Sequence, residues 1–218
     1  MTAGGTLLSG LVKMPKTGTL LVFEGPDGVG KSTLVKEAEN ILKLRGVRFD
    51  SLSFPGKDPG TLGWVVDQIH HTPKAFDICR LTPLSLQALH IAAHLDHIES
   101  RILPVLAQGA WFILDRFWWS TWVYGTVERV TAGVLDKLIE AERAAWRETV
   151  PAVAFLIGRT SAFRPEQTDA KFLELVKLYN DVALQAKKRH RVISLSNEDL
   201  STSVNTIRAE IDILAASG

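Results

Sequence analysis

The chain has few of the features that mark disulfide-rich, membrane-spanning or strongly charged proteins. Its one cysteine, Cys79, excludes an internal disulfide and fits a reducing compartment. No stretch approaches the run of about 18 apolar residues that a spanning helix needs. The formal net charge of +1 excludes a global field that would attract nucleic acid or anionic lipid. We therefore expect a cytoplasmic protein without nucleic-acid or membrane partners, in which any anion is bound at a local site.

Length and composition favour one globular domain. The 218 residues are 46% hydrophobic and 22% charged, which suits one α/β domain with a full core rather than two. Residues 1–18 lack a basic lead, and glycine interrupts their apolar segment, so we expect a flexible N-terminal extension rather than a secretory signal. No repeat or linker interrupts residues 19–218, which we expect to form a single domain.

Short apolar runs alternate with longer stretches of helical periodicity, a pattern typical of parallel strands joined by crossover helices. Strands are expected at 19–23, 47–54, 111–114, 152–157 and 191–195. Helices are expected at 32–44, 60–71, 82–108 with a break near Pro104, 131–147, 169–188 and 202–216. The sequence therefore predicts an α/β fold, a parallel sheet of about five strands flanked by helices on both faces.

The segment FEGPDGVGKST at 23–33 has the spacing of a phosphate-binding loop (P-loop) between a strand and a helix. Its glycines let backbone N–H groups approach phosphate oxygens, and the helix start adds its positive end. In such loops the lysine, here Lys31, reaches the β- and γ-phosphates, and the serine hydroxyl, here Ser32, binds Mg²⁺. We expect a P-loop NTPase fold whose ATP-binding residues include Gly25, Gly28, Gly30, Lys31, Ser32 and Thr33.

Asp115 and Arg116 directly follow a buried strand. Because the carboxyl ends of parallel strands border the ligand crevice, Asp115 is expected to hold the metal and Arg116 to bind phosphate. An ion pair that only caps the strand is the alternative. A guanine-binding Asn-Lys-x-Asp sequence is absent, and the chain is short for a mechanical ATPase, so these features favour a small kinase.

Four segments together resemble thymidylate kinases: FEGPDGVGKST, FPGKDPGT at 54–61, ALHIAAHLDHIESRILPVLAQG, and DRFWWSTWVYG. Their order and spacing match over residues 19–126, and more loosely to the C-terminus. The resemblance implies a nucleoside monophosphate kinase that uses Mg²⁺ and ATP to phosphorylate dTMP or a related pyrimidine nucleotide. It also implies a homodimer.

The resemblance also assigns the acceptor site. Asp27 is expected to accept a hydrogen bond from the sugar 3′-hydroxyl, while Lys57 and Arg116 contact the acceptor phosphate. Lys57 as a solvated loop lysine is the alternative. The remaining acceptor-binding residues are expected to be Phe54, His90, His94 and Tyr124.

His90 and His94 depart from the family pattern, which has an aromatic residue and an arginine against the base. His94 still has a ring N–H that can donate to a carbonyl group. Two alternatives are a helix face without a binding role and, with His97, a zinc site, although the accompanying Glu or cysteines of zinc motifs are absent. Trp118, Trp119 and Trp122 are either core residues or an aromatic wall against the base.

The lid at 158–167 is shorter than in the family by about a helix, and Gly28 occupies the position of a loop arginine that some members use. Charge on the transferred phosphoryl group requires a cation, so we expect it from Arg164, or else from Arg159. Arg159 is alternatively expected to stack on the adenine of ATP. Lys31, Arg116 and Arg164 are thus the expected catalytic residues.

Two other functions stay open at this point. A deoxynucleoside kinase needs a carboxylate base for its hydroxyl acceptor, and Asp58 follows Lys57 after the second expected strand. A nucleotide-binding protein without catalysis is the other alternative, in which the short lid no longer closes.

Overall fold

Five parallel strands form the centre of the computed structural model, which describes residues 18–161 and 169–217. The strands are β1 (Leu20–Glu24), β2 (Phe49–Ser53), β3 (Trp111–Asp115), β4 (Val153–Gly158) and β5 (Val192–Ser196), in the order β2-β3-β1-β4-β5. The central strand β1 and its neighbour β3 are buried along their whole length, whereas the edge strands β2 and β5 are partly accessible. The predicted sheet is confirmed.

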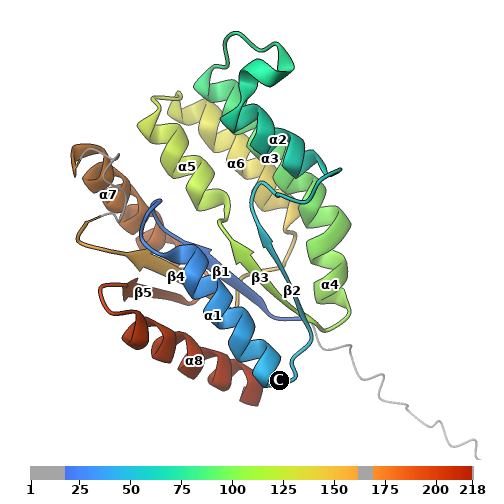
Figure 1. Ribbon diagram of the computed structural model, residues 1–218, viewed down its shortest axis with the longest axis vertical. Helices are drawn as coiled ribbons and strands as arrows, with labels where there is room; N and C mark the ends of the chain where they lie inside the picture. Colours follow the sequence, from blue (N-terminus) through green and yellow to red (C-terminus); the bar gives the residue numbers. More distant parts are fainter. Residues whose placement is uncertain (1–17, 162–168, 218) are drawn as a thin grey trace, which may run out of the picture.

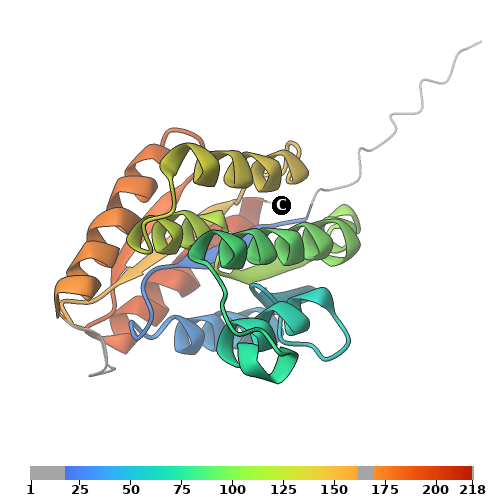
Figure 2. The same cartoon turned by 90° about the horizontal axis from the view of Figure 1, so that it is seen from above.

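Helices cover both faces of the sheet (Figures 1 and 2). One face carries α1 (Lys31–Leu44) and α8 (Leu200–Ser217). The other carries α4 (Leu103–Ala107), α5 (Trp118–Val127) and α7 (Asp169–Ala186), with α3 (Pro83–His97) and α6 (Ala132–Ala145) beside α5. Next to α3 lies α2 (Leu62–His71), and the short 3₁₀ turn η1 (Pro73–Phe76) packs against α2.

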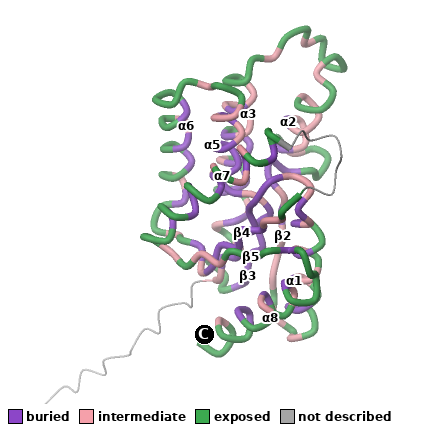
Figure 3. Tube along the Cα trace, turned by 90° about the vertical axis from the view of Figure 1, so that its left-hand side faces the viewer, coloured by how far each residue is buried: buried purple, intermediate pink, exposed green. Residues whose placement is uncertain are grey.

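Alternation along the strands divides the apolar residues into two cores. In β1, Leu20 and Val22 contribute to one core, and Leu21 and Phe23 to the other. Buried residues of α1 recur at helical spacing and close the second core: Leu34, Ala38, Ile41 and Leu42. The purple strands of Figure 3 lie between the inner faces of these helices. Within residues 18–161 and 169–217, every helix is too short or too polar to cross a membrane.

The long helix predicted at 82–108 is divided, and the break lies earlier than expected. After α3 the chain makes a π-helical turn, η2 (Ile98–Ile102), and then continues as α4. Pro104 lacks the N–H that a continuous α-helix would use at this position. A π-helical turn such as η2 is one of the ways in which a helix adjusts where a backbone hydrogen bond is missing.

All five strands end at the same edge of the sheet because they run parallel. The loops after β1, β2 and β3 therefore meet there. The sequence predicts binding residues in each of these three loops, as it does in the segment after β4.

Candidate active site

The loop between β1 and α1 has the backbone geometry of a phosphate-binding loop. Gly25, Gly28 and Gly30 have φ angles of 139°, 78° and 87°, which residues with a side chain rarely adopt. Gly25 is constrained twice, because a Cβ atom there would lie 2.1 Å from the carbonyl oxygen of Ile157 in β4. Gly30 has no side chain to cap α1, so N–H groups of the first helical turn remain for a ligand.

Lys31 lies across this loop, and its side chain is buried. Its Nζ donates to the carbonyl oxygens of Gly25 and Pro26, each at 2.8 Å. Burial, followed by repulsion from Arg116, lowers the pKa of Lys31 to about 8, although nearby carboxylates oppose this. A phosphate group in the loop would offset both the burial of the ammonium group and its repulsion from Arg116, so the site favours binding of an anion next to Lys31.

Asp115, at the end of β3, has the properties of a metal ligand. Its side chain is buried, and Oδ2 accepts a hydrogen bond from Ser53 Oγ at 3.3 Å. Oδ1 is buried with no hydrogen-bond partner within the described residues. Ser32 lines the same cavity. A carboxylate and a hydroxyl supply hard oxygen atoms, and Mg²⁺ prefers such ligands, so these two residues fit the predicted ion.

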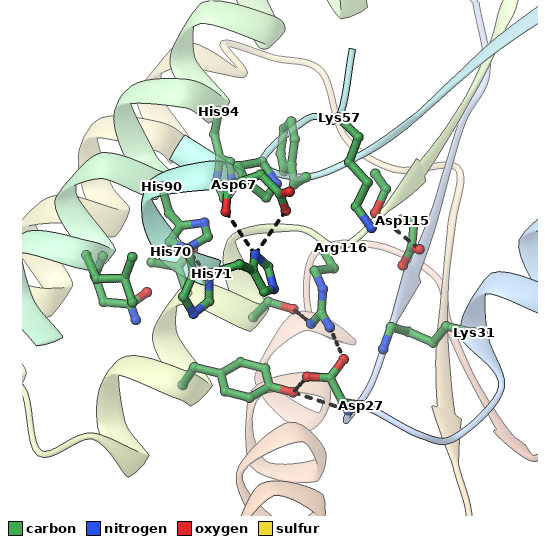
Figure 4. Close-up of a pocket in the computed structure, with 18 of the residues that line it drawn as sticks. Asp27, Lys31, Lys57, Asp67, His70, His71, His90, His94, Asp115 and Arg116 are labelled. Carbon is green, nitrogen blue, oxygen red and sulfur yellow. Dashed lines mark hydrogen bonds and ion pairs between the residues drawn. The ribbon is translucent and has the colours of Figure 1, made fainter. Parts of the chain in front are cut away.

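Asp27 of the phosphate loop forms a hydrogen-bonded group with Arg116 after β3 and Tyr124 of α5; Figure 4 shows Asp27 beside Arg116. The Arg116 guanidinium pairs with Asp27 and lies 5.5 Å from the centre of the Tyr124 ring. The Tyr124 hydroxyl donates to the second carboxylate oxygen of Asp27 at 2.8 Å. Burial raises the pKa of Asp27, but the charges of Arg116 and Lys31 outweigh it, so the net change is downward. Asp27 is thus held as a carboxylate, which can accept a hydrogen bond from a ligand hydroxyl.

A buried glutamate, Glu24, which was not predicted from the sequence, is connected to Arg116 through the hydroxyl of Ser120. Glu24 ends β1 and accepts hydrogen bonds from the backbone N–H groups of Phe117 (2.7 Å) and Ser120 (3.0 Å). It therefore caps α5, whose own N-cap residue Phe117 has no polar side chain. The Ser120 hydroxyl donates to Glu24 at 2.7 Å and accepts from Arg116 at 3.0 Å. A glutamate at the end of an otherwise apolar strand is the signal that would have indicated this role.

A cavity of about 730 Å³ connects these groups to one face of α3 (Figure 4). His90 borders it and lies 3.3 Å from His70, Nε2 to Nδ1. Burial and the neighbouring histidines lower the pKa of His90 to about 2, so its ring is neutral. His94 also borders the cavity and stacks on Phe54, with ring centres 3.9 Å apart and an angle of 10° between the planes.

The three α3 histidines do not form a zinc site. Across residues 18–161 and 169–217, no group of three or more His, Cys, Asp or Glu side chains is arranged to hold a metal ion. His97 does not line the cavity, and its Nε2 lies 2.3 Å and 2.5 Å from where a Cβ atom at Gly56 and Gly63 would be. It is a packing residue between α3 and the loop after β2.

The loop after β2 brings a lysine, but not the neighbouring carboxylate, to the cavity. Lys57 is exposed, lines the cavity and extends towards Asp115 (Figure 4). Asp58 instead pairs with Arg101 at 2.6 Å and does not line the cavity. The carboxylate on which the deoxynucleoside kinase alternative depended is therefore engaged elsewhere.

The family model of thymidylate kinase matches residues 23–200. The chain belongs to the thymidylate kinase family. Members of this family are ATP-dependent nucleotide kinases, the class of enzyme that the sequence predicts.

Curated relatives agree with this assignment at different coverage. Thymidylate kinase of Bradyrhizobium sp. (strain BTAi1) is 33% identical over 129 residues, which are 59% of this chain and 55% of that protein. The thymidylate kinase of Nitrobacter hamburgensis is 30% identical over 226 aligned positions, with 90% and 89% of the two chains covered. That of Pelotomaculum thermopropionicum is 29% identical, with 91% and 95% covered. A crystal structure of thymidylate kinase from Ehrlichia chaffeensis has the same fold, with a TM-score of 0.67 at 22% identity, and covers 91% of this chain and 99% of that one.

Most of the residues predicted from the phosphate-loop spacing, the end of the third strand and the thymidylate kinase resemblance come together at one cavity. Its lining includes Asp27, Gly28, Gly30, Lys31, Ser32, Thr33, Phe54, Lys57, His90, His94, Asp115, Arg116 and Tyr124. Gly25 does not line the cavity, but its carbonyl oxygen accepts a hydrogen bond from Lys31. Gln87 and Ser120 also line the cavity and were missed. The individual roles given to these residues stay predictions.

The tryptophans beside Arg116 are packing residues, and the hypothesis of an aromatic wall against the base is wrong. Trp119 is fully buried in the core. Trp118 lies under Arg143, with the guanidinium 5.5 Å from its ring centre, and Trp122 Nε1 donates to Asp136 at 3.3 Å. None of the three lines the cavity.

Of the two arginines predicted in the lid, Arg164 lies outside the described residues. Arg159 follows β4 and pairs with Glu198 at 3.1 Å, and its guanidinium also donates to the backbone carbonyl of Asn197. The Asn197 side chain in turn donates to the carbonyl oxygen of Val29 in the phosphate loop, at 2.8 Å. Arg159 is thus attached to the loop after β5 and, through it, to the phosphate loop.

Proposed function

We propose that this chain transfers the γ-phosphoryl group of ATP to a deoxynucleoside monophosphate, with dTMP or a related pyrimidine nucleotide as the acceptor. The observation that carries the proposal is the single cavity that joins the phosphate loop to Asp27, Arg116 and Tyr124 and to the histidines of α3. Such a cavity suits two nucleotides bound end to end, with their phosphates between Lys31 and Arg116.

The charges around the cavity suit an anionic acceptor. Lys57 and Arg116 would offset the repulsion between the acceptor phosphate and the triphosphate. An acceptor phosphate oxygen is already ionised at neutral pH, so the attack requires no general base. Asp27, whose pKa is lowered, is suited to accept a hydrogen bond from a sugar hydroxyl.

On the donor side, Lys31 would exchange its two carbonyl partners for β- and γ-phosphate oxygens. Ser32 and Asp115 would hold Mg²⁺, which neutralises charge on the phosphates when it is bound. We propose Arg164 as the cation that offsets charge on the transferred group. Arg164→Ala is then expected to lower kcat by orders of magnitude with little change in ATP affinity.

We also propose that the protein is cytoplasmic and works as a homodimer, as the family resemblance implies. Exposed apolar side chains on α3 and α6, such as Leu84 and Val134, support contact through helices. Light scattering at micromolar concentration tests the dimer, and a monomeric mass would contradict it.

A coupled assay of ADP release tests the reaction. Purified protein is offered ATP with dTMP, dUMP, dCMP, dAMP, dGMP or thymidine. Turnover is expected with a pyrimidine monophosphate and is expected to be lost in Lys31→Ala. Lys36→Ala is the matched control, because Lys36 is exposed on the same helix and does not line the cavity. Turnover on thymidine without turnover on any monophosphate would refute the proposal.

A further inference from the structure

The loop between β2 and α2 brings Lys57 to the cavity, yet few contacts fix its course. Gly56 and Gly60, on either side of Lys57, have φ angles of 119° and 87°, which glycine adopts readily. Apart from bonds to the start of α2, residues 55–60 make one hydrogen bond to another element within residues 18–161 and 169–217. In it, Arg101 of η2 donates to the carboxylate of Asp58 at 2.6 Å. The position of Lys57 therefore depends on the residue that follows it.

Arg101 is held in place before it meets Asp58. Its Nε and one terminal nitrogen donate to the two carboxylate oxygens of Asp50, each at 2.8 Å, and the same terminal nitrogen donates to the carbonyl oxygen of Ser51 at 3.2 Å. Hydrogen bonds from Arg101 lower the pKa of Asp50, so this partner stays charged. A planar guanidinium bound to β2 in this way offers its other terminal nitrogen to Asp58 in a fixed direction.

Asp58 also connects this loop to the next helix. Its backbone carbonyl oxygen accepts from the N–H of Thr61 at 3.2 Å and from the Thr61 hydroxyl at 2.8 Å. Thr61 is the N-cap residue of α2, and its side chain accepts from the N–H of Trp64 at 3.1 Å. Asp58 is thus fixed from η2 through its side chain and from α2 through its backbone.

Neither Arg101 nor Asp58 lines the cavity, whereas Lys57 does and extends towards Asp115 (Figure 4). We propose that Arg101 and Asp58 are positioning residues, a clamp between β2 and the following loop that keeps Lys57 at the phosphate end of the cavity. We take the acceptor phosphate as the partner of Lys57, so this role rests on the proposed function. Asp58 is exposed, and an exposed ion pair contributes little to stability. The clamp therefore acts on the position of Lys57 and not on folding.

Asp58→Ala tests the clamp, because two views of Asp58 predict opposite signs. The substitution removes a negative charge next to Lys57, and electrostatics alone would then strengthen the binding of an anionic acceptor and lower its KM. Loss of the clamp instead releases Lys57, so the KM for the acceptor monophosphate is expected to rise about ten-fold, the scale of one weakened charged contact. The KM for ATP and the midpoint of urea unfolding should change little. An acceptor KM that falls or stays the same would overturn the proposal.

Arg101→Lys separates geometry from charge. Lysine keeps the positive charge but has no planar fork to join two carboxylates, so the acceptor KM should rise as in Asp58→Ala. An unchanged KM in this variant would refute the clamp. Asp212→Ala is the matched control, because Asp212 is likewise exposed, pairs with Arg45 at 2.6 Å and does not line the cavity. Its loss should leave both KM values unchanged.

A double substitution tests whether Asp58 acts through Lys57. In a Lys57→Ala background, adding Asp58→Ala should raise the acceptor KM no further, because the side chain that the clamp positions is already absent. A further rise would show that Asp58 acts by another route and would overturn the proposal.

Backbone ¹⁵N relaxation of the ligand-free protein tests the clamp without turnover. The order parameters of the amides of Gly56, Lys57 and Gly60 are expected to be about 0.85 in the wild type and below about 0.6 in Asp58→Ala. Equal order parameters in the two proteins would overturn the clamp. If they fall in the variant but no monophosphate is phosphorylated by the wild type, the proposed reaction fails while the clamp on this loop stands.

Discussion

Ser120→Ala removes one oxygen atom that three side chains share. The hydroxyl donates to Glu24 at 2.7 Å, accepts from Arg116 at 3.0 Å and lies 2.8 Å from the hydroxyl of Tyr179. Ser120, Glu24 and Tyr179 are all buried. Their lost hydrogen bonds are therefore replaced poorly by solvent.

The structure sets the size of the loss. A buried polar group that loses its partner costs about 1–3 kcal/mol. Glu24 keeps its bonds to the N–H groups of Phe117 and Ser120, and Arg116 keeps Asp27, so the lower end applies to these two groups. The buried Tyr179 hydroxyl keeps no other partner within the described residues, so the full range applies to it. We expect the free energy of unfolding to fall by about 3–5 kcal/mol. We also expect kcat/KM for the acceptor to fall by about ten-fold, because Arg116 is then held from one side instead of two.

Urea unfolding followed by circular dichroism measures the stability, with Ser203→Ala as the matched control. Ser203 is similarly buried, but its hydroxyl has no hydrogen-bond partner within the described residues. Removing that hydroxyl should change the free energy of unfolding by less than about 0.5 kcal/mol. Equal losses in the two variants would refute the view that the shared hydroxyl, and not burial alone, stabilises this site.

Two further predictions concern the end of β1. Gly25→Ala should abolish ATP binding in calorimetry, because the new Cβ atom would collide with the Ile157 carbonyl oxygen and the backbone φ of 139° is unfavourable for alanine. Gly133→Ala is the control and should bind ATP normally, because a Cβ atom there meets nothing within 4 Å. Burial raises the pKa of Glu24 from 4.5 to about 7 in the folded chain, against the attraction of Arg116, so its protonated form is favoured by folding. Its contribution is complete below about pH 4.5 and is lost as the pH rises through 7, by about 3 kcal/mol in all. The free energy of unfolding should therefore fall from pH 4 to pH 8 by about 3 kcal/mol more in the wild type than in Glu24→Gln, and parallel changes would contradict it.

Local patterns predicted the fold and the phosphate loop well. The glycine spacing, Lys31 and Ser32 lie within eight residues of one another, and their chemistry follows from a short stretch of backbone. The helix interrupted near Pro104 was recognised, but the break was placed too late, because a π-helical turn has no clear sequence signal.

The acceptor side was predicted less completely because its contacts are distant in sequence. Asp27 and Arg116 are 89 residues apart, and His94 and Glu142 are 48 residues apart. The resemblance to thymidylate kinases named Asp27, Arg116 and His94, but periodicity alone does not reveal the partner of each. The sequence likewise left open whether Trp118 and Trp122 pack in the core or face the base, and it did not indicate that neither lines the cavity.

Asn197 connects two segments at the edge of the sheet where the nucleotide site lies. Its side chain is attached to the phosphate loop after β1, and its carbonyl oxygen receives Arg159 at the end of β4. One residue after β5 thus links the phosphate loop after β1 to the end of β4. A displacement of either segment strains a bond to the other, so opening of the nucleotide site is expected to involve the ends of three strands together.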